Sequence, residues 1–136
     1  MPEELVVRAC IVALCLIGLY VSFFMLRKYV RAQRGQLDEP SVVSSPRARI
    51  TRVPNAFVGL VYYSLLLALT PFLTWAYPLA VHAALAAGLV AALASIYLAY
   101  SLLFVTRMPC GYCWTGHVVN WTLLALLVWL ERMMPR

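Results

Sequence analysis

The sequence predicts an all-α integral membrane protein, a bundle of four transmembrane helices with a polar first loop that contains a short surface helix. Its composition supports this fold class, because 64% of the 136 residues are hydrophobic and only 12% are charged. Soluble domains average roughly half apolar and a quarter charged residues. Four apolar stretches are also close to the about 20 residues that a helix needs to cross a hydrocarbon core. We expect one transmembrane domain over residues 1–136, with spans at about 5–26, 56–76, 79–105 and 112–131.

The first span, residues 5–26, is expected to stay in the membrane rather than to be removed as a signal peptide. Its apolar run is longer than the about 7–15 residues of a signal peptide, and no small-residue cleavage site follows it. The basic segment from Arg27 to Arg34 continues the same helix out of the membrane. Gly35 is expected to end this extension, since glycine is the usual residue just beyond a helix C-terminus.

The first loop, residues 27–55, is the only sizeable polar segment. Residues 37–40, which read Leu-Asp-Glu-Pro, predict a turn, and residues 44–50 predict the short surface helix. Pro54 is expected in the first turn of the second span, where its missing N–H costs little. Hydroxyl side chains within the later spans are expected to form hydrogen bonds between helices, namely Ser64, Thr70, Ser95, Ser101 and Thr122.

Positive charge is concentrated on one side of this topology. With four spans, the first and third loops share one side, and both termini share the other. Eight cations lie on the loop side: Arg27, Lys28, Arg31, Arg34, Arg47, Arg49, Arg52 and Arg107. Three lie on the terminal side: Arg8, Arg132 and Arg136. The positive-inside rule therefore places the loop side in the cytoplasm. Lipid headgroups, rather than nucleic acid, are the expected partners of the net charge of +6.

A pair of cysteines, Cys110 and Cys113, stands on the loop side where the fourth span begins. Two cysteines at this spacing can close a small disulfide ring, and the start of a helix favours the thiolate form. The same spacing also builds zinc sites and haem attachments. Haem attachment requires a histidine directly after the second cysteine, where this chain has Trp114. A metal site formed with His117 stays an alternative, although a closed zinc site needs a fourth ligand.

Three segments, residues 44–49, 53–63 and 110–117, together resemble the vitamin K epoxide reductase family. They read Ser-Ser-Pro-Arg-Ala-Arg, Val-Pro-Asn-Ala-Phe-Val-Gly-Leu-Val-Tyr-Tyr and Cys-Gly-Tyr-Cys-Trp-Thr-Gly-His. The resemblance implies a four-helix bundle that binds a quinone, such as ubiquinone or menaquinone, near the cysteine pair. It also implies that a thioredoxin-like partner supplies electrons from a dithiol. These electrons would pass through Cys110 and Cys113 to the quinone, so that disulfides are generated.

The resemblance also implies roles for individual residues. Cys113 would face the quinone, and Asn55 and His117 match positions that line the quinone pocket. His117 follows Cys113 by four residues and so shares its helix face, where it would hydrogen-bond a quinone carbonyl or make an ordinary interhelical contact. Asn55 would bond the other carbonyl or cap its own helix. Phe57 and Tyr63 are candidates for walls of a flat ring, with ordinary packing as the alternative.

The chain departs from the family pattern in its first loop. Most members carry two further cysteines there, which relay electrons, whereas residues 27–109 contain none. Cys110 must then meet its partner directly or through some other thiol. Cys15 is a poor substitute, since it lies about 18 Å from the loop end of its span at about 1.5 Å per residue. We expect Cys10 and Cys15 to act as small hydrophobic residues. A binding or transport protein that has kept this fold and lost the redox cycle stays open as a second alternative.

Overall fold

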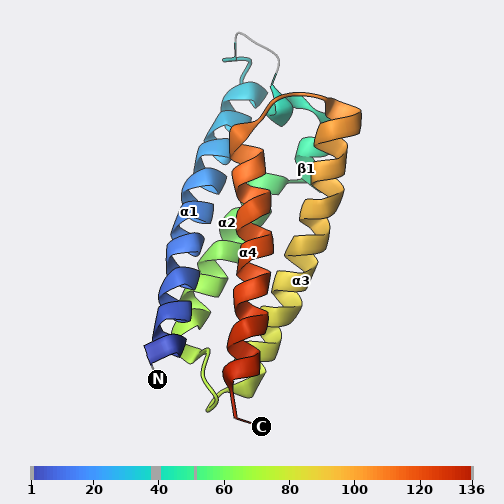
Figure 1. Ribbon diagram of the computed structural model, residues 1–136. Coiled ribbons are helices and arrows are strands. Elements are labelled where there is room, and N and C mark those ends of the chain that lie inside the picture. The colour runs from blue at the N-terminus through green and yellow to red at the C-terminus, as the bar shows by residue number, and fades with distance from the viewer. Residues whose placement is uncertain (1, 38–40, 51, 136) are drawn as a thin grey trace.

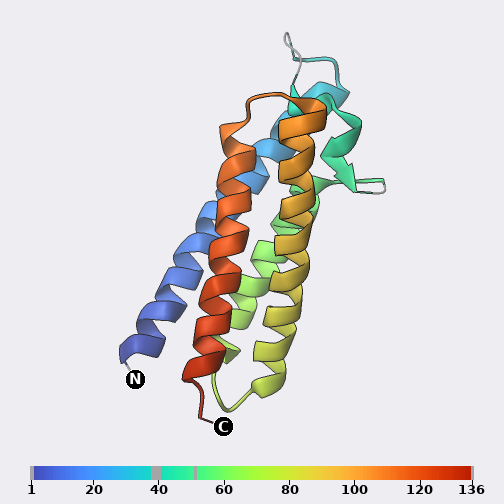
Figure 2. The ribbon, with the colours of Figure 1, turned by 45° about the vertical axis from the view of Figure 1, so that its right-hand side comes forward.

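The computed structural model describes residues 2–37, 41–50 and 52–135, and in this part of the chain four helices form an antiparallel bundle (Figure 1). They are α1 (Pro2–Gln33), α2 (Asn55–Leu69), α3 (Pro78–Tyr100) and α4 (Gly111–Met133). With the helical turns that prolong α2 and α3, all four are long and apolar enough to cross a membrane. The predicted fold class is therefore confirmed. Figures 1 and 2 show the two ends of the chain together at one end of the bundle, with the first loop and the α3–α4 connection at the other.

The first helix runs beyond its apolar span, as predicted, and ends in a glycine cap. Gly35 has a left-handed backbone with a φ of 67°, which costs little because glycine has no Cβ. Its N–H donates to the Ala32 carbonyl at 3.1 Å, and the Gln36 N–H donates to the Arg31 carbonyl at 3.0 Å. This pair of bonds is the Schellman arrangement, which satisfies the last carbonyls of a helix.

The loop does not form the single short helix predicted at residues 44–50. Two 3-10 turns, Val42–Ser44 and Pro46–Ala48, are followed by a two-stranded antiparallel ribbon. In this ribbon β1 (Arg49–Ile50) pairs with β2 (Val53–Pro54).

Two prolines explain why the loop is divided. Pro46 forces the residue before it into an extended conformation, and Ser45 accordingly has φ −70° and ψ 146°. Pro54 is extended as well and stands immediately before α2 rather than in its first turn. The turn predicted at residues 37–40 falls largely on residues 38–40, which lie outside the described part of the chain.

The ends of the second and third spans also depart from a regular α-helix. A 3-10 turn, Thr70–Phe72, follows α2, so the second span stops short of the expected residue 76. Pro71 explains this end, because it has no N–H to continue the helical bonding. The third span continues through a π-helical turn, Ser101–Thr106, and ends at Arg107, whose φ is 53°.

Packing within the bundle is uneven. α1 packs against α2 and α4, and α3 packs against α4, whereas α2 and α3 make few contacts with each other. The hydrophobic core lies in the half of the bundle near the termini, where Ile11, Leu123 and Leu127 are fully buried. The outer faces carry many exposed apolar side chains, which suits contact with lipid.

Only some of the hydroxyl groups join different elements. Ser95 accepts a bond from α4, and Ser101 accepts one from the first loop. Thr70 and Thr122 instead donate to carbonyls four residues earlier in their own helices, both at 2.8 Å, so the interhelical prediction is wrong for them. A threonine hydroxyl in a helix reaches that carbonyl without any partner helix. Ser64 is exposed.

Candidate functional site

Cys110 and Cys113 lie at the first turn of α4, where the chain re-enters the bundle after α3. Their sulfurs form a disulfide, and their Cα atoms are 5.3 Å apart, within the usual range for such a bond. Cys110 is the capping residue of α4, and its sulfur accepts a hydrogen bond of 3.2 Å from the Cys113 N–H. This N–H is one of the donors that a helix N-terminus leaves unpaired. When the disulfide is reduced, the same donor favours a thiolate on Cys110.

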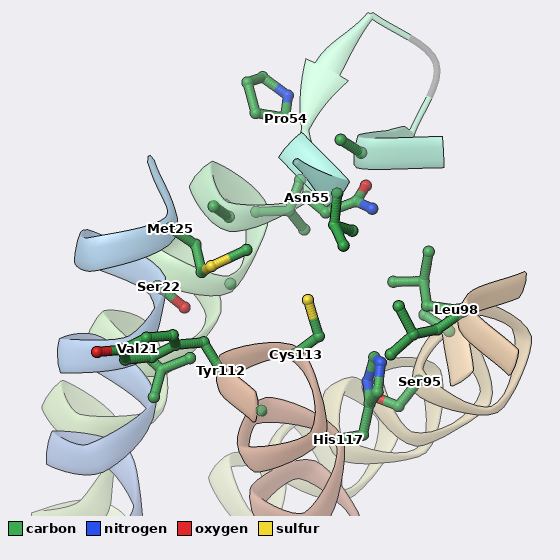
Figure 3. Close-up of a pocket in the computed structure, with 18 of the residues that line it drawn as sticks. Val21, Ser22, Met25, Pro54, Asn55, Ser95, Leu98, Tyr112, Cys113 and His117 are labelled. Atoms are coloured by element: carbon green, nitrogen blue, oxygen red, sulfur yellow. The ribbon is translucent and has the colours of Figure 1, made fainter. Parts of the chain in front are cut away.

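A cavity of about 210 Å³ opens beside the disulfide in the loop-side half of the bundle (Figure 3). All four helices and the first loop contribute to its wall, which is mostly apolar. An engineered cavity of about 150 Å³ already binds benzene, so this one has room for a six-membered ring. Cys113 lines the cavity, whereas Cys110 lies outside its wall. The two sulfurs of one disulfide therefore face different surroundings.

Asn55, the first residue of α2, lines this cavity and carries an unsatisfied buried acceptor. Its Nδ2 donates to the main-chain carbonyl of Arg47 at 2.8 Å, while its Oδ1 is buried and has no partner in the described structure. A buried acceptor without a partner costs about 1–3 kcal/mol, and a donor on a bound molecule would remove that cost. The side chain does not cap α2, whose capping residue is Pro54. The helix-capping alternative is therefore not observed.

His117 lies one turn after Cys113 and lines the same cavity. It is only 7% exposed and sits between two tryptophan rings. The Trp114 ring meets it edge-on at 6.0 Å between centroids, and the Trp121 ring stacks on it at 6.2 Å. Within the described residues its ring forms no hydrogen bond, so its nitrogens are free to bond a molecule in the cavity. In the view of Figure 3, Asn55 lies above the Cys113 sulfur and His117 below it.

A polar chain that the sequence analysis missed crosses the bundle beside His117. Tyr63 Oη donates to Asn120 Oδ1 at 2.6 Å, and Asn120 Nδ2 donates to Ser95 Oγ at 2.7 Å. The chain joins α2, α4 and α3, and all three residues line the cavity. Asn120 could have been identified from the sequence, because burying an amide inside an apolar span costs free energy unless the amide has an interhelical partner.

The two aromatic candidates have different positions. Tyr63 lines the cavity and is 3% exposed. Phe57 is 47% exposed and does not line it. Two residues after Asn55, it points about 200° away around the helix, so the structure does not bring it into the site. Arg47 is a further lining residue that sequence reasoning did not single out.

The other two cysteines lie away from this site, and the site gives the metal alternative no support. Cys15 is buried in the core, and Cys10 is exposed on α1; both are free thiols. The described residues contain no group of three histidine, cysteine or acidic side chains arranged to hold a metal ion. The geometry therefore gives the zinc alternative no support.

A family model described as the vitamin K epoxide reductase family matches residues 9–128, a range that includes both cysteines of the disulfide and the residues lining the cavity. A search of curated proteins finds no match.

Proposed function

The chain belongs to the vitamin K epoxide reductase family of membrane thiol/quinone oxidoreductases, and we propose that it generates disulfides in a partner protein with a membrane quinone as the electron acceptor. The observation that carries this proposal is that the two sulfurs of the disulfide face different surroundings. Cys113 lines an apolar cavity that suits a lipid-soluble ring, and Cys110 lies outside it, where a protein thiol can attack.

The partner dithiol reacts first with the Cys110 sulfur. A partner thiolate attacks Cys110, a mixed disulfide forms, and Cys113 leaves as the thiolate. The second partner thiol then attacks the mixed disulfide and releases Cys110. The Cys113 N–H that bonds the Cys110 sulfur stabilises this leaving group. In balance, the partner gains a disulfide and the Cys110–Cys113 pair becomes a dithiol.

The residues around the cavity suit re-oxidation of this dithiol. A bound quinone accepts two electrons and two protons, which equals what two thiols lose when a disulfide forms. Asn55 Oδ1 would accept a hydrogen bond from the reduced ring, and a ring N–H of His117 would donate one to the oxidised ring. Tyr63 and the apolar wall would exclude water from Cys113. Either ubiquinone or menaquinone has a head group of this kind.

The partner must reach Cys110 directly, because residues 27–109 contain no cysteine that could relay electrons. A thioredoxin-like protein, which carries its own pair of cysteines on its surface, suits this role. The excess of arginine on the loop side favours a cytoplasmic location for the reaction. Disulfide-rich cytoplasms are known in hyperthermophiles.

Two cysteine variants test the proposed order of events. In nanodiscs that contain menaquinone, the wild type should oxidise a reduced thioredoxin. Cys113→Ala should stop turnover, because it cannot form the enzyme disulfide that the partner attacks. Its Cys110 thiol should form a mixed disulfide with a single-cysteine thioredoxin whose sulfur is activated as an aryl disulfide, and the aryl thiol should be released. Cys110→Ala should form no such adduct. Undiminished oxidation by Cys110→Ala would refute the proposal and favour a redox-inactive protein.

The proposed side of the membrane is tested separately in intact cells. After mild reduction, Cys110 should resist a membrane-impermeant maleimide until the cells are permeabilised. Labelling of Cys110 from outside in intact cells would overturn the cytoplasmic assignment.

A further inference from the structure

Arg47, in the second 3-10 turn of the loop, uses its main chain and its side chain to join separate parts of the fold. Its N–H donates to Ser45 Oγ at 3.2 Å, and its carbonyl accepts from Asn55 Nδ2 at 2.8 Å. Its guanidinium donates to the hydroxyls of Tyr97 and Ser101, both on the third span, with 3.0 Å to Ser101. The guanidinium also lies 5.5 Å from the centroid of the Tyr97 ring, close enough for a cation–π contact.

The Arg47 carbonyl determines which end of the Asn55 amide is left without a partner. A main-chain carbonyl can only accept a hydrogen bond, so the nitrogen end of the amide must face Arg47. The oxygen end is then left buried and unpaired on a residue that lines the cavity. If this carbonyl moved away, the amide would be free to turn and offer a donor in place of an acceptor.

Apart from the two-residue strands β1 and β2, the loop has little structure of its own to hold that carbonyl in place. The two 3-10 turns of the loop contain three residues each, and such short turns have weak internal bonding. α2 and α3 make few direct contacts. The guanidinium of Arg47 is therefore a principal link between the third span and the start of α2.

We propose that Arg47 is a positioning residue of the quinone site. Anchored on Tyr97 and Ser101, its side chain holds the main-chain carbonyl that turns the Asn55 oxygen into the cavity. The proposal rests on the proposed function, since it assumes that a quinone is the molecule that Asn55 meets. It adds that the loop and the third span together determine whether Asn55 offers a hydrogen-bond acceptor or a donor to that molecule.

Arg47→Met tests this role, because methionine keeps part of the side-chain length and removes every donor of the guanidinium. The measured quantities are the Kd of menadiol, from quenching of tryptophan fluorescence under anaerobic conditions, the Kd of menadione, and the KM for reduced thioredoxin. We expect the Kd of menadiol to rise about three- to tenfold, the effect of losing one hydrogen bond. The Kd of menadione should not rise, because the oxidised ring has no donor for the Asn55 oxygen. The KM for thioredoxin should not change, because Cys110 lies outside the cavity.

Arg52→Met is the matched control, since it removes the same charge from an exposed position in the same loop. It should bind menadiol as the wild type does. Equal weakening by both variants would show a general effect of charge and would overturn the positioning role. If Arg47→Met does not fold, the double variant Tyr97→Phe/Ser101→Ala replaces it, because it removes both acceptors and leaves the arginine in place.

A double-mutant cycle with Asn55→Leu gives the sharpest answer. If Arg47 acts through Asn55, Arg47→Met should cause no further rise in the Kd of menadiol once Asn55 is leucine. Effects that multiply would show that Arg47 acts independently, and the proposal would fail. If the wild type reduces menadione and binds menadiol, and Arg47→Met binds menadiol equally well, the positioning role alone is overturned. A wild type that does not bind menadione would overturn the quinone site itself, and the positioning role with it.

Discussion

Gly18 on α1 is predicted to be required for the position of Tyr63, and Gly18→Ala tests this. A Cβ at residue 18 would lie 2.5 Å from two ring carbons of Tyr63 and 2.7 Å from a third. The ring has little freedom to move, because it is 3% exposed and its hydroxyl is bonded to Asn120. The added methyl must therefore push the ring out of its place beside the cavity.

The expected loss of stability follows from three contributions. Overpacking a core costs about 1–3 kcal/mol. A displaced Tyr63 also loses its hydrogen bond to Asn120, about 0.5–1.5 kcal/mol. Replacing a helical glycine by alanine returns up to about 1 kcal/mol. The net expectation is a free energy of unfolding that is lower by about 0.5–3.5 kcal/mol.

The measurement is reversible unfolding in mixed detergent micelles, followed by circular dichroism. Gly116→Ala is the control, because the only neighbour of its new Cβ within 4 Å is a Val21 methyl at 4.0 Å, an ordinary contact. In a Tyr63→Leu background, Gly18→Ala should lose most of its effect. An equal loss in both backgrounds, or no loss in the wild type, would refute the steric reasoning.

Four further predictions concern the site and its surroundings. His117→Phe should raise the KM for menadione about three- to tenfold and leave the rate of exchange between Cys110 and thioredoxin unchanged. A fall in that exchange rate as large as the rise in KM would contradict a quinone-side role. Asn120→Leu leaves two buried hydroxyls without their partner and should lower the free energy of unfolding by about 1–3 kcal/mol; an unchanged unfolding curve would contradict this. Arg107→Gly should stabilise the protein by about 0.5–1 kcal/mol, because it relieves a left-handed backbone at φ 53°, and a lower unfolding midpoint would oppose it. The double variant Cys10→Ser/Cys15→Ala should retain quinone-dependent thioredoxin oxidation, and a tenfold loss would show that these thiols take part.

The membrane fold could be predicted because it depends on long-range composition rather than on particular contacts. Four apolar stretches of sufficient length dictate four helices, since only a helix satisfies its own backbone in lipid. The extension of α1 and its end at Gly35 could be predicted because glycine caps act within a few residues. The single surface helix at residues 44–50 was wrong because Pro46, inside the stretch, favours an extended residue before it.

The candidate site was only partly predictable, for a geometric reason. The position of Cys113 relative to His117 follows from helical periodicity, and α4 brings both to the cavity. Phe57 was a candidate because an aromatic side chain can wall a flat ring, although the helix turns it outward. The role of Arg47 depends on contacts with residues 50 and 54 positions away, which no local pattern records.

The central claim is that electrons pass from the cysteine pair to a quinone in the cavity. Its most direct test is a single turnover with purified protein whose disulfide has been reduced and whose excess reductant has been removed. On addition of menadione, the wild type should lose two thiols for each quinone reduced, and Cys113→Ser should reduce none. Quinone reduction with no loss of thiols, or reduction by Cys113→Ser at the wild-type rate, would contradict the account.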